Sequence, residues 1–380
     1  MERATFKTMK MKNRNLVLNY IRVHSGISRA DIAQQSGLTP PTVSSIAKSL
    51  LDENIIFESI AGESKGGRKP RLLKMNDDEN KVIGVYIGPK TVETVITNLR
   101  GEVDDTFVDE INRTISKEEL EKLIAKNIQR ITESPHQYLG IGIAMHGFVD
   151  VENHTSLYAP LLLNIKDFDF SFLEDTFGLP IHVENDVRCK LWAEVSRVKP
   201  HHKNILYINL GYGVGGAIMI DNQLYNGSHN IAGELGHTII EMNGRQCECG
   251  RRGCLQAYVS GLSLTNIARD KNIIGEEETV KELLVKADND NHEAQNEIVK
   301  IGMYLGTAIS NQMNVLDPDL IILGGGVSNL YPYFKESLYK TLKNEGDISN
   351  FGQAEIKIGE IQKSTAPQGA ALLVLDKIFT

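Results

Sequence analysis

Residues 233–254 read Gly-Glu-Leu-Gly-His-Thr-Ile-Ile-Glu-Met-Asn-Gly-Arg-Gln-Cys-Glu-Cys-Gly-Arg-Arg-Gly-Cys. They hold three of the four cysteines of the chain, Cys247, Cys249 and Cys254, and His237 lies ten residues before the first of these. One imidazole and three thiolates make a complete tetrahedral shell for a structural Zn²⁺ ion. The glycines between the cysteines allow tight turns, so closely spaced sulfurs can face one ion. A redox pair or chance clustering is the alternative, but Cys-x-Cys is too short for ordinary disulfide geometry. The stretch therefore predicts a structural zinc site around which the body is organised.

The composition is that of a globular protein long enough for two or three domains. The chain has 380 residues, of which 41% are hydrophobic and 24% are charged, and both fractions are ordinary. No apolar run has the length of a membrane span, and the first residues lack the apolar core of a signal peptide. We therefore expect a cytoplasmic protein with reduced thiols and no membrane partner.

Charge is distributed unevenly along the chain. Residues 1–75 hold 13 Lys+Arg and 6 Asp+Glu, whereas residues 76–380 hold the remaining 28 and 43. A basic head on an acidic body indicates that the head binds a polyanion and the body does not. A solvated surface is the alternative, and the pattern within the head argues against it.

The head has the pattern of a helix-turn-helix. Residues 15–24 predict a first helix, and Ser28 begins a second helix with a pattern that resembles a capping box. Gly37 ends the second helix as a C-cap. Thr39 caps a third helix, which has Pro40 in its first turn and runs to about residue 54. This order makes the third helix the recognition helix.

Two strands and a basic loop complete a winged domain. Residues 55–60 and 71–75 predict the strands, and the glycine-rich basic loop between them would be the wing. A helix-turn-helix pattern alone can also be a packing or dimerisation module, but the wing and the local charge favour DNA binding. The predicted DNA contacts are Arg29, Thr39, Pro41, Thr42, Ser44, Ser45 and Lys48 around the recognition helix, and Lys65, Arg68 and Lys69 in the wing.

The body alternates strands with helices. Strands are predicted within 82–98 and over 103–111, 139–144, 181–184, 204–210, 216–220 and 320–323, and helices over 116–134, 172–177, 187–195, 292–316 and 364–379. Glycines follow several of the strands. This alternation predicts an α/β body with a site between two lobes.

Four motifs of the body resemble, in their order, those of the ROK family, which comprises repressors, open reading frames and sugar kinases. They are Val-Glu-Asn-Asp at 183–186, Leu-Gly-Tyr-Gly-Val-Gly-Gly-Ala at 210–217, Gly-Glu-Leu-Gly-His at 233–237 and Cys-x-Cys-Gly-x-x-Gly-Cys at 247–254. The resemblance covers residues 80 to 380, and the winged head matches the repressor branch, of the xylose-repressor and N-acetylglucosamine-repressor type. It implies a two-lobed actin- and hexokinase-like (ribonuclease H-like) body with a sugar in the cleft between the lobes. The expected domains are 1–75 for the winged helix-turn-helix and 76–380 for the body, with lobes at about 80–185 plus 364–380 and about 186–363.

The resemblance also implies roles for individual residues. Asn185 and Asp186 are expected to contact sugar hydroxyls, and Asp186 matches the aspartate that acts as general base in the kinases. Glu234 and His237 are expected to face the sugar, with the other ring nitrogen of His237 on zinc. Gln256 is a further expected contact, at a position where sugar-binding members usually have Glu. Asn185 and Asp186 could also cap a helix, because the residues after them predict one.

The first phosphate loop departs from the family pattern Asp-x-Gly-Gly-Thr. The matching residues here are Tyr86, Ile87, Gly88, Pro89 and Lys90. Tyr86 removes the carboxylate that helps to hold Mg²⁺, and Pro89 removes a backbone N–H and a flexible glycine from a loop that must cradle phosphate. We therefore expect a body that does not catalyse phosphoryl transfer, in which Asp186 is a vestigial base.

Two cations near the expected cleft, Arg188 and Lys190, stand where the family usually has small residues. We interpret them as surface charges, and the alternative is that they favour a phosphorylated or acidic sugar.

The resulting expectation is a sugar-responsive repressor of a carbohydrate-utilisation operon. A homodimer or tetramer would bind double-stranded operator DNA through its heads. A sugar or sugar phosphate would shift the equilibrium between states of different DNA affinity. The alternatives are an active ATP-dependent sugar kinase with a DNA-binding head, and a repressor controlled by a transporter protein.

Overall fold

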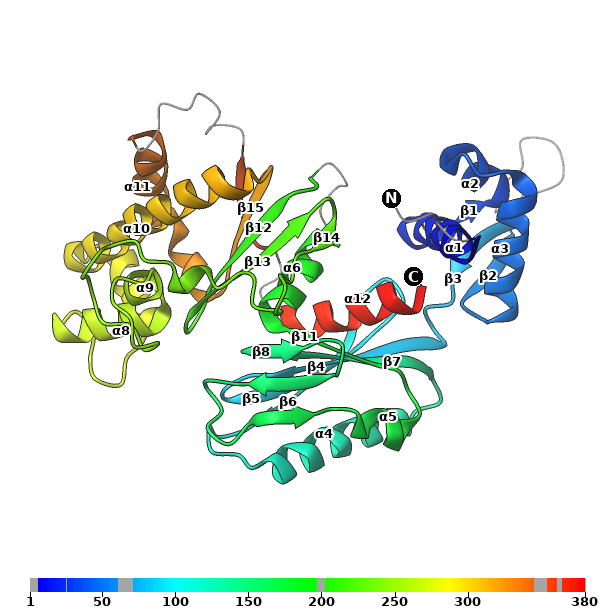
Figure 1. Cartoon of the computed structure of the whole chain (residues 1–380), viewed down its shortest axis with the longest axis horizontal. Helices are drawn as coiled ribbons and strands as arrows, with labels where there is room; N and C mark the ends of the chain where they lie inside the picture. Colours follow the sequence, from blue (N-terminus) through cyan, green and yellow to red (C-terminus); the bar gives the residue numbers. More distant parts are fainter. Residues whose placement is uncertain are drawn as a thin grey trace. The chain divides into compact units, whose positions relative to one another are not determined.

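The computed structural model describes residues 6–24, 26–60, 71–196, 202–344, 354–360 and 364–379. The chain divides into two compact units, whose helices and strands are labelled in Figure 1. The first unit comprises Met1–Ala193 and Ser364–Thr380, and the second comprises Glu194–Lys363. Among the described residues, no helix combines the length and the apolar character that a membrane span requires.

The head, in the first unit, has the element order of a winged helix-turn-helix. Its described elements are α1 (Phe6–Val23), β1 (Ile27–Ser28), α2 (Arg29–Ser36), α3 (Pro40–Asp52), β2 (Ile56–Ile60) and β3 (Arg71–Met75). The strands pair antiparallel in the order β1-β3-β2. The Ser28 hydroxyl accepts a hydrogen bond from the Asp31 N–H at 3.2 Å, and Gly37 follows α2 with a φ of 72°. Both predicted caps of the second helix are therefore confirmed.

The first helix begins earlier than the sequence predicts. We expected a start at Asn15, but α1 begins at Phe6. Met9 and Met11 in its first half are 53% and 40% exposed. The described apolar side chains of this half thus form no buried stripe, which is the main sequence signal of a helix. The two-residue strand β1 was also missed, because it is too short to show a period.

A mixed five-stranded sheet forms the body of the first unit, in the order β11-β7-β4-β5-β6. Its strands are β4 (Asn80–Ile87), β5 (Thr91–Thr97), β6 (Val103–Glu110), β7 (Gln137–Met145) and β11 (Ile181–Asn185), and its helices are α4 (Lys117–Thr132), α5 (Phe172–Phe177), α6 (Asp186–Val195) and α12 (Thr365–Phe379). Ile83 of β4 packs with Ile124 of α4. On the other face, a Cβ at Gly84 would lie 2.0 Å from the Pro367 carbonyl oxygen of α12. Alternate residues of β4 thus face different helices, and α4 and α12 cover opposite faces of the sheet (Figure 1).

A small antiparallel sheet in the first unit was not predicted. It has the order β10-β9-β8 and consists of β8 (Phe148–Asp150), β9 (Thr155–Tyr158) and β10 (Lys166–Asp169). These strands have three or four residues each, which is too few to establish an alternating pattern.

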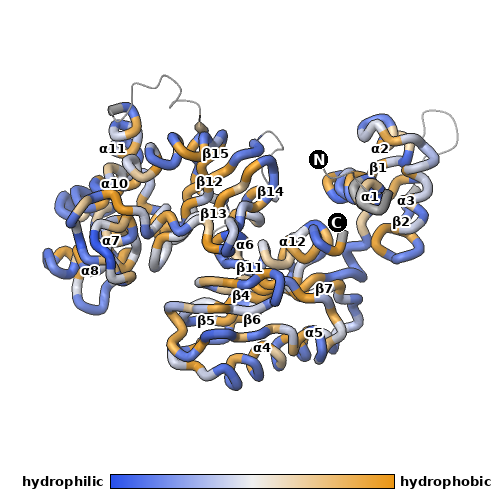
Figure 2. The backbone as a smooth tube through the Cα atoms, viewed as in Figure 1, coloured by the Kyte–Doolittle hydropathy of each residue, from blue (hydrophilic) through white to orange (hydrophobic). Residues whose placement is uncertain are grey.

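The second unit is built on another mixed sheet, in the order β14-β13-β12-β15-β16. Its strands are β12 (Ile205–Leu210), β13 (Val214–Ile220), β14 (Gln223–Leu224), β15 (Leu320–Gly324) and β16 (Glu355–Ile358), and its helices are η1 (Leu235–His237), α7 (Gln256–Val259), α8 (Gly261–Asp270), α9 (Val280–Asp288), α10 (His292–Leu316), η2 (Gly326–Leu330) and α11 (Tyr331–Asn344). The central strands β12 and β15 are mainly hydrophobic (Figure 2), as expected for strands paired on both sides and covered by helices.

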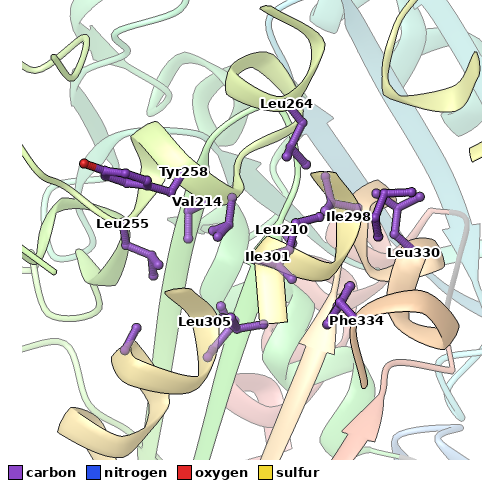
Figure 3. Packing of buried hydrophobic residues seen from close by; sticks show 14 of the residues in the cluster. Leu210, Val214, Leu255, Tyr258, Leu264, Ile298, Ile301, Leu305, Leu330 and Phe334 are labelled. Carbon is purple, nitrogen blue, oxygen red and sulfur yellow. The ribbon is translucent and has the colours of Figure 1, made fainter. Parts of the chain in front are cut away.

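The core of the second unit joins this sheet to α10. Leu210, Ile301 and Leu305 are fully buried in one cluster, and Figure 3 shows Leu210 of β12 near Ile301 of α10. Each such side chain contributes about 1.5–3 kcal/mol of burial free energy. The winged head and the α/β class of the body are confirmed. Helices α7, α8, α9 and α11 and strands β14 and β16 were not predicted.

Candidate functional site

A cluster of three cysteines and one histidine lies in the second unit. The ligand atoms of His237, Cys247, Cys249 and Cys254 all lie within 4.8 Å of one another. His237 ends η1, and an isolated antiparallel bridge between Ile239 and Cys254 fixes the end of this loop beside it. The sequence-predicted ligands are thus brought together, and the cluster has the composition to hold a metal ion.

The spacing of the sulfurs fits a tetrahedral ion and not a disulfide. The Cys249 and Cys254 Sγ atoms lie 3.7 Å apart, and Cys247 Sγ lies 3.7 Å from His237 Nδ1. Tetrahedral Zn²⁺ with bonds of about 2.3 Å to sulfur and 2.0–2.1 Å to nitrogen would place these pairs about 3.8 and 3.6 Å apart. A disulfide would need an S–S distance of about 2.0 Å. The donor set and its geometry therefore fit zinc.

The pKa values of two of the four groups, Cys249 and His237, are shifted towards the states that bind metal. Burial acts to raise the pKa of Cys249, but hydrogen bonds from Arg251 and the neighbouring thiols outweigh it and lower the pKa to about 7. Burial lowers the pKa of His237, and Arg251 adds to this effect. A neutral imidazole and an accessible thiolate are the protonation states in which these groups bind metal.

Two further predicted site residues, Glu234 and Gln256, precede and follow this cluster in the sequence. His237 Nδ1 faces Cys247, and its Nε2 lies 4.0 Å from Glu234 Oε2. Gln256 begins α7, and its Oε1 accepts a hydrogen bond from the Val214 N–H at 3.1 Å. Gln256 thereby ties the cysteine loop to the glycine-rich turn between β12 and β13.

Three loops of the first unit meet at one edge of its sheet. Strands β4, β7 and β11 are parallel, and their register places Ile87 beside Met145 and Met145 beside Asn185. The residues that follow these strands therefore emerge at the same edge, where open α/β sheets usually place their sites. Tyr86 and Gly88, His146, and Asn185 with Asp186 are brought together in this way.

Asn185 is engaged at both ends of its amide. Its Oδ1 accepts from the Val187 and Arg188 N–H groups at 2.9 and 3.2 Å, and its Nδ2 donates to the Gly147 carbonyl at 3.0 Å. Asn185 therefore caps α6, as the sequence suggested it could. Asp186 is the first residue of α6 and is buried.

The interpretation of Arg188 and Lys190 as surface charges is wrong. The Arg188 and Glu184 side chains are each 3% exposed and form an ion pair at 2.7 Å. Lys190 Nζ binds Asp186 Oδ2 at 2.7 Å, and these side chains are 17% and 10% exposed. In both pairs an acidic residue precedes a basic residue by four positions at the start of α6. This spacing was the sequence signal that could have revealed the pairs.

Tyr86 lies against the loop that follows β4. A Cβ at Gly88 would be 2.7 Å from the Tyr86 hydroxyl oxygen, and Lys190 Nζ lies 5.6 Å from the ring centroid. Burial raises the pKa of Tyr86 to about 12, so the hydroxyl stays neutral. Nearby, His146 is buried, and its Nε2 accepts from the Leu161 N–H at 3.2 Å. Neither residue was predicted as a site residue, and Tyr86 was noted only as a departure from the family pattern.

The head presents a polar surface on α3. Pro41, Ser44, Ser45 and Lys48 are exposed, while the hydroxyls of Thr39 and Thr42 are hydrogen-bonded to each other at 2.8 Å. Arg29 Nη2 is paired with Glu58 Oε1 of β2 at 2.7 Å, and Arg71 binds the other oxygen of Glu58 at 2.6 Å. The predicted wing contacts Lys65, Arg68 and Lys69 lie outside the described residues.

Comparison with known proteins adds three kinds of match. Residues 82–377 match the ROK family, and residues 12–56 match a winged helix-turn-helix DNA-binding family. A xylose repressor of Bacillus spizizenii is 31% identical, over 97% of this chain and 96% of that protein. A crystal structure of a ROK family transcriptional regulator, a homologue of the E. coli MLC protein, has a TM-score of 0.85 at 25% identity and covers 98% of this chain and 97% of its own.

A kinase also resembles the body of this chain. The structure of a ROK family glucokinase from Streptomyces griseus with glucose and AMPPNP has a TM-score of 0.67 at 25% identity, and covers 77% of this chain and 98% of its own. The full-length matches thus include the head, whereas the kinase match is to the body. The protein belongs to the ROK family and carries a winged helix-turn-helix head in front of the family's two-lobed, sugar-kinase-like body.

Proposed function

We propose that the protein is a sugar-responsive transcriptional repressor of a carbohydrate-utilisation operon. The observation that carries this proposal is the coupling of a winged helix-turn-helix to a ROK body along the whole length shared with a xylose repressor. The exposed polar face of α3 would bind the edges of bases in the major groove, and basic side chains would bind phosphate. The predicted contacts are those named above for α3, Arg29 and the wing.

The body is proposed to bind a sugar as an effector and not to catalyse phosphoryl transfer. Support comes from the loop after β4, where Tyr86 covers Gly88 and Pro89 offers no N–H to a phosphate. Kinases of this type need that loop, with Mg²⁺, to hold ATP. Asp186, which matches the kinase base, is instead bound by Lys190 at 2.7 Å.

The proposed sugar contacts are Asn185 and Asp186 in the first unit and Glu234, His237 and Gln256 in the second. Buried carboxylates and amides discriminate among sugars because a ligand that leaves them unpaired loses affinity. Since Lys190 neutralises Asp186 and lies at the same edge, sugar phosphates or sugar acids belong in the effector screen beside neutral sugars.

The cysteine cluster is proposed to hold a structural zinc ion through His237, Cys247, Cys249 and Cys254. Three thiolates and an imidazole leave no open position for a substrate, so the ion would supply rigidity and no chemistry. It would fix the ring of His237 and, through the loop, the position of Glu234.

A homodimer or tetramer is proposed, because two heads on one face of DNA would match a palindromic operator. The effector would shift the population between states of different DNA affinity, by no more than its difference in affinity for those states. A repressor controlled by a transporter protein is the remaining alternative, and a pull-down with and without transporter induction separates it.

The test couples DNA binding to sugar. An operator is first selected from a random-sequence duplex pool with the full-length protein, and anisotropy of the labelled duplex is then followed as xylose, glucose, N-acetylglucosamine and their phosphates are added. At least one compound should change the affinity, and Asp186→Asn and Glu234→Gln should each remove the response. Asp175→Asn, on the exposed surface of α5, is the matched control.

If no compound changes the DNA affinity of the wild-type protein, the sugar response is refuted. If a coupled ADP assay detects turnover with any of these sugars, the non-catalytic assignment is refuted.

A further inference from the structure

A groove in the head lies between the first helix and the recognition helix. Met9, Lys10 and Asn13 of α1 form one side, and Pro41, Thr42, Ser45 and Ile46 of α3 form the other. Its volume is about 470 Å³. Three of the α3 residues, Pro41, Thr42 and Ser45, also belong to the proposed DNA-binding face, so the groove is continuous with that face.

The charge of α1 is of one sign. Between Phe6 and Val23 the helix contains three lysines and two arginines and no aspartate or glutamate. One of these cations already forms an ion pair. Arg14 Nη2 lies 2.6 Å from Oε2 of Glu53, which is the C-cap of α3. Lys10 is exposed and lines the groove. Among the side chains of α1 that the structure describes, Lys10 is therefore the cation that lines the groove.

The lining combines two kinds of surface. Met9, Pro41 and Ile46 are apolar, whereas Lys10, Asn13, Thr42 and Ser45 carry hydrogen-bond donors. A deoxyribose-phosphate backbone has the same two characters, since its sugar presents C–H groups and its phosphate oxygens accept hydrogen bonds and attract cations. The recognition helix would enter the major groove of the DNA. The α1–α3 groove beside this helix would then lie along the DNA strand that borders the major groove.

We propose that the α1–α3 groove binds the DNA backbone, with Lys10 on a phosphate and the exposed Met9 and Pro41 against the adjoining deoxyribose. The footprint of the head then extends beyond the recognition helix and the wing onto α1. This inference rests on the proposed DNA binding and adds a binding surface to it. The first half of α1, which the sequence did not predict as helix, would thereby contact DNA.

A sequence-independent contact can be tested without the operator. The probe is a labelled 30-base-pair duplex of mixed sequence, titrated with the full-length protein at several salt concentrations between 50 and 200 mM. Each phosphate contact contributes about 0.9 to the slope of log affinity against log salt. Lys10→Gln is expected to lower the magnitude of this slope by about 0.9 for each head on the duplex. Between 50 and 200 mM salt, the factor by which salt weakens binding should then be about three- to fourfold smaller per head.

The matched control is Lys126→Gln, which removes an exposed lysine from α4 of the body and should leave the slope unchanged. Asn13→Ala should lower affinity without changing the slope, because it removes a donor and no charge. Thermal unfolding of each variant checks that the head is intact.

The outcomes separate this inference from the proposed function. If the wild-type protein shows no salt-dependent duplex binding, DNA binding itself fails. If the wild type binds and Lys10→Gln has the wild-type slope, only the α1 contact is overturned. If Lys10→Gln leaves the slope unchanged and alters the sedimentation coefficient, the groove is an interface between copies, and the proposal is again overturned.

Discussion

The ion pair between Glu184 and Arg188 offers the sharpest test of the first unit. Both side chains are 3% exposed and their N–O distance is 2.7 Å. Arg188→Met would leave the Glu184 carboxylate buried beside the Asn185 N–H, which donates to its Oε1 at 2.7 Å. Removing one partner of a buried pair costs about 3–5 kcal/mol, since the remaining charge is uncompensated. We expect Arg188→Met to lower the free energy of unfolding by that amount.

The chain contains its own reporter for this measurement. Trp192 is the only tryptophan of the sequence and lies on α6, one turn after Arg188. Urea unfolding followed by Trp192 fluorescence therefore reports the helix that carries the pair. With a urea dependence of about 2–3 kcal/mol per molar, the expected shift of the midpoint is about 1–2 M.

Two comparison variants make the result specific. Lys190→Met breaks the neighbouring pair with Asp186, whose side chains are 17% and 10% exposed, so its cost should be smaller, about 1–2 kcal/mol. The double variant Glu184→Gln with Arg188→Met leaves no buried charge and should recover more than half of the loss. A cost below about 1 kcal/mol for Arg188→Met, or no recovery in the double variant, would refute the burial argument.

Three further predictions follow from the same structure. Burial lowers the pKa of His182 to about 3, whereas the unfolded value is about 6.5. The unfolded chain thus binds an extra proton between these pH values. The free energy of unfolding therefore falls by up to about 1.4 kcal/mol per pH unit as the pH drops below 6.5. His182→Leu should flatten this dependence between pH 6.5 and 5 in thermal unfolding, and an unchanged slope would contradict it. Metal analysis should find one zinc per chain, lost on Cys249→Ser and retained on Cys189→Ala; equal contents in the two variants would argue against the assigned ligands. A Cβ at Gly369 would lie 1.8 Å from the Cys189 carbonyl oxygen, so Gly369→Ala should destabilise by several times the roughly 1 kcal/mol expected for Gly178→Ala, which meets nothing within 4 Å. Urea unfolding compares the two, and similar costs would be inconsistent with close packing of α12.

Local signals in the sequence predicted the head and much of the two sheets. Ser28 and Gly37 cap α2 as their residue types require, and the bounds of α10 (His292–Leu316) agree with the prediction. Other local signals were present and not used. Thr279 and Glu282 form a capping box at the start of α9, yet α9 was not predicted, although Val280, Leu283, Leu284 and Ala287 have the spacing of one helical face.

Burial was predicted less well than helices and strands. Arg188 follows a motif that the family uses for sugars, and a cation there suggested an exposed side chain. Its partner Glu184 lies at the end of β11 and not on α6. A charge becomes buried only when it is paired, and the four-residue spacing alone does not show that both side chains lie in the interior.

The parallel order β11-β7-β4 places the β11–α6 junction, where the sugar is proposed to bind, at the same edge of the sheet as the loop after β4. In the proposed function, recognition of the sugar depends on this junction, where Asn185, the last residue of β11, caps α6 and Asp186 is bound by Lys190. Phosphoryl transfer depends in addition on the loop after β4, because that loop must hold phosphate and Mg²⁺. There the Tyr86 ring lies against Gly88, followed by Pro89. The two places are linked through Lys190, whose Nζ lies 5.6 Å from the centroid of the Tyr86 ring and 2.7 Å from Asp186 Oδ2. In the proposed sensor, the sugar would therefore bind at the β11–α6 junction beside a β4 loop that does not bind a nucleotide.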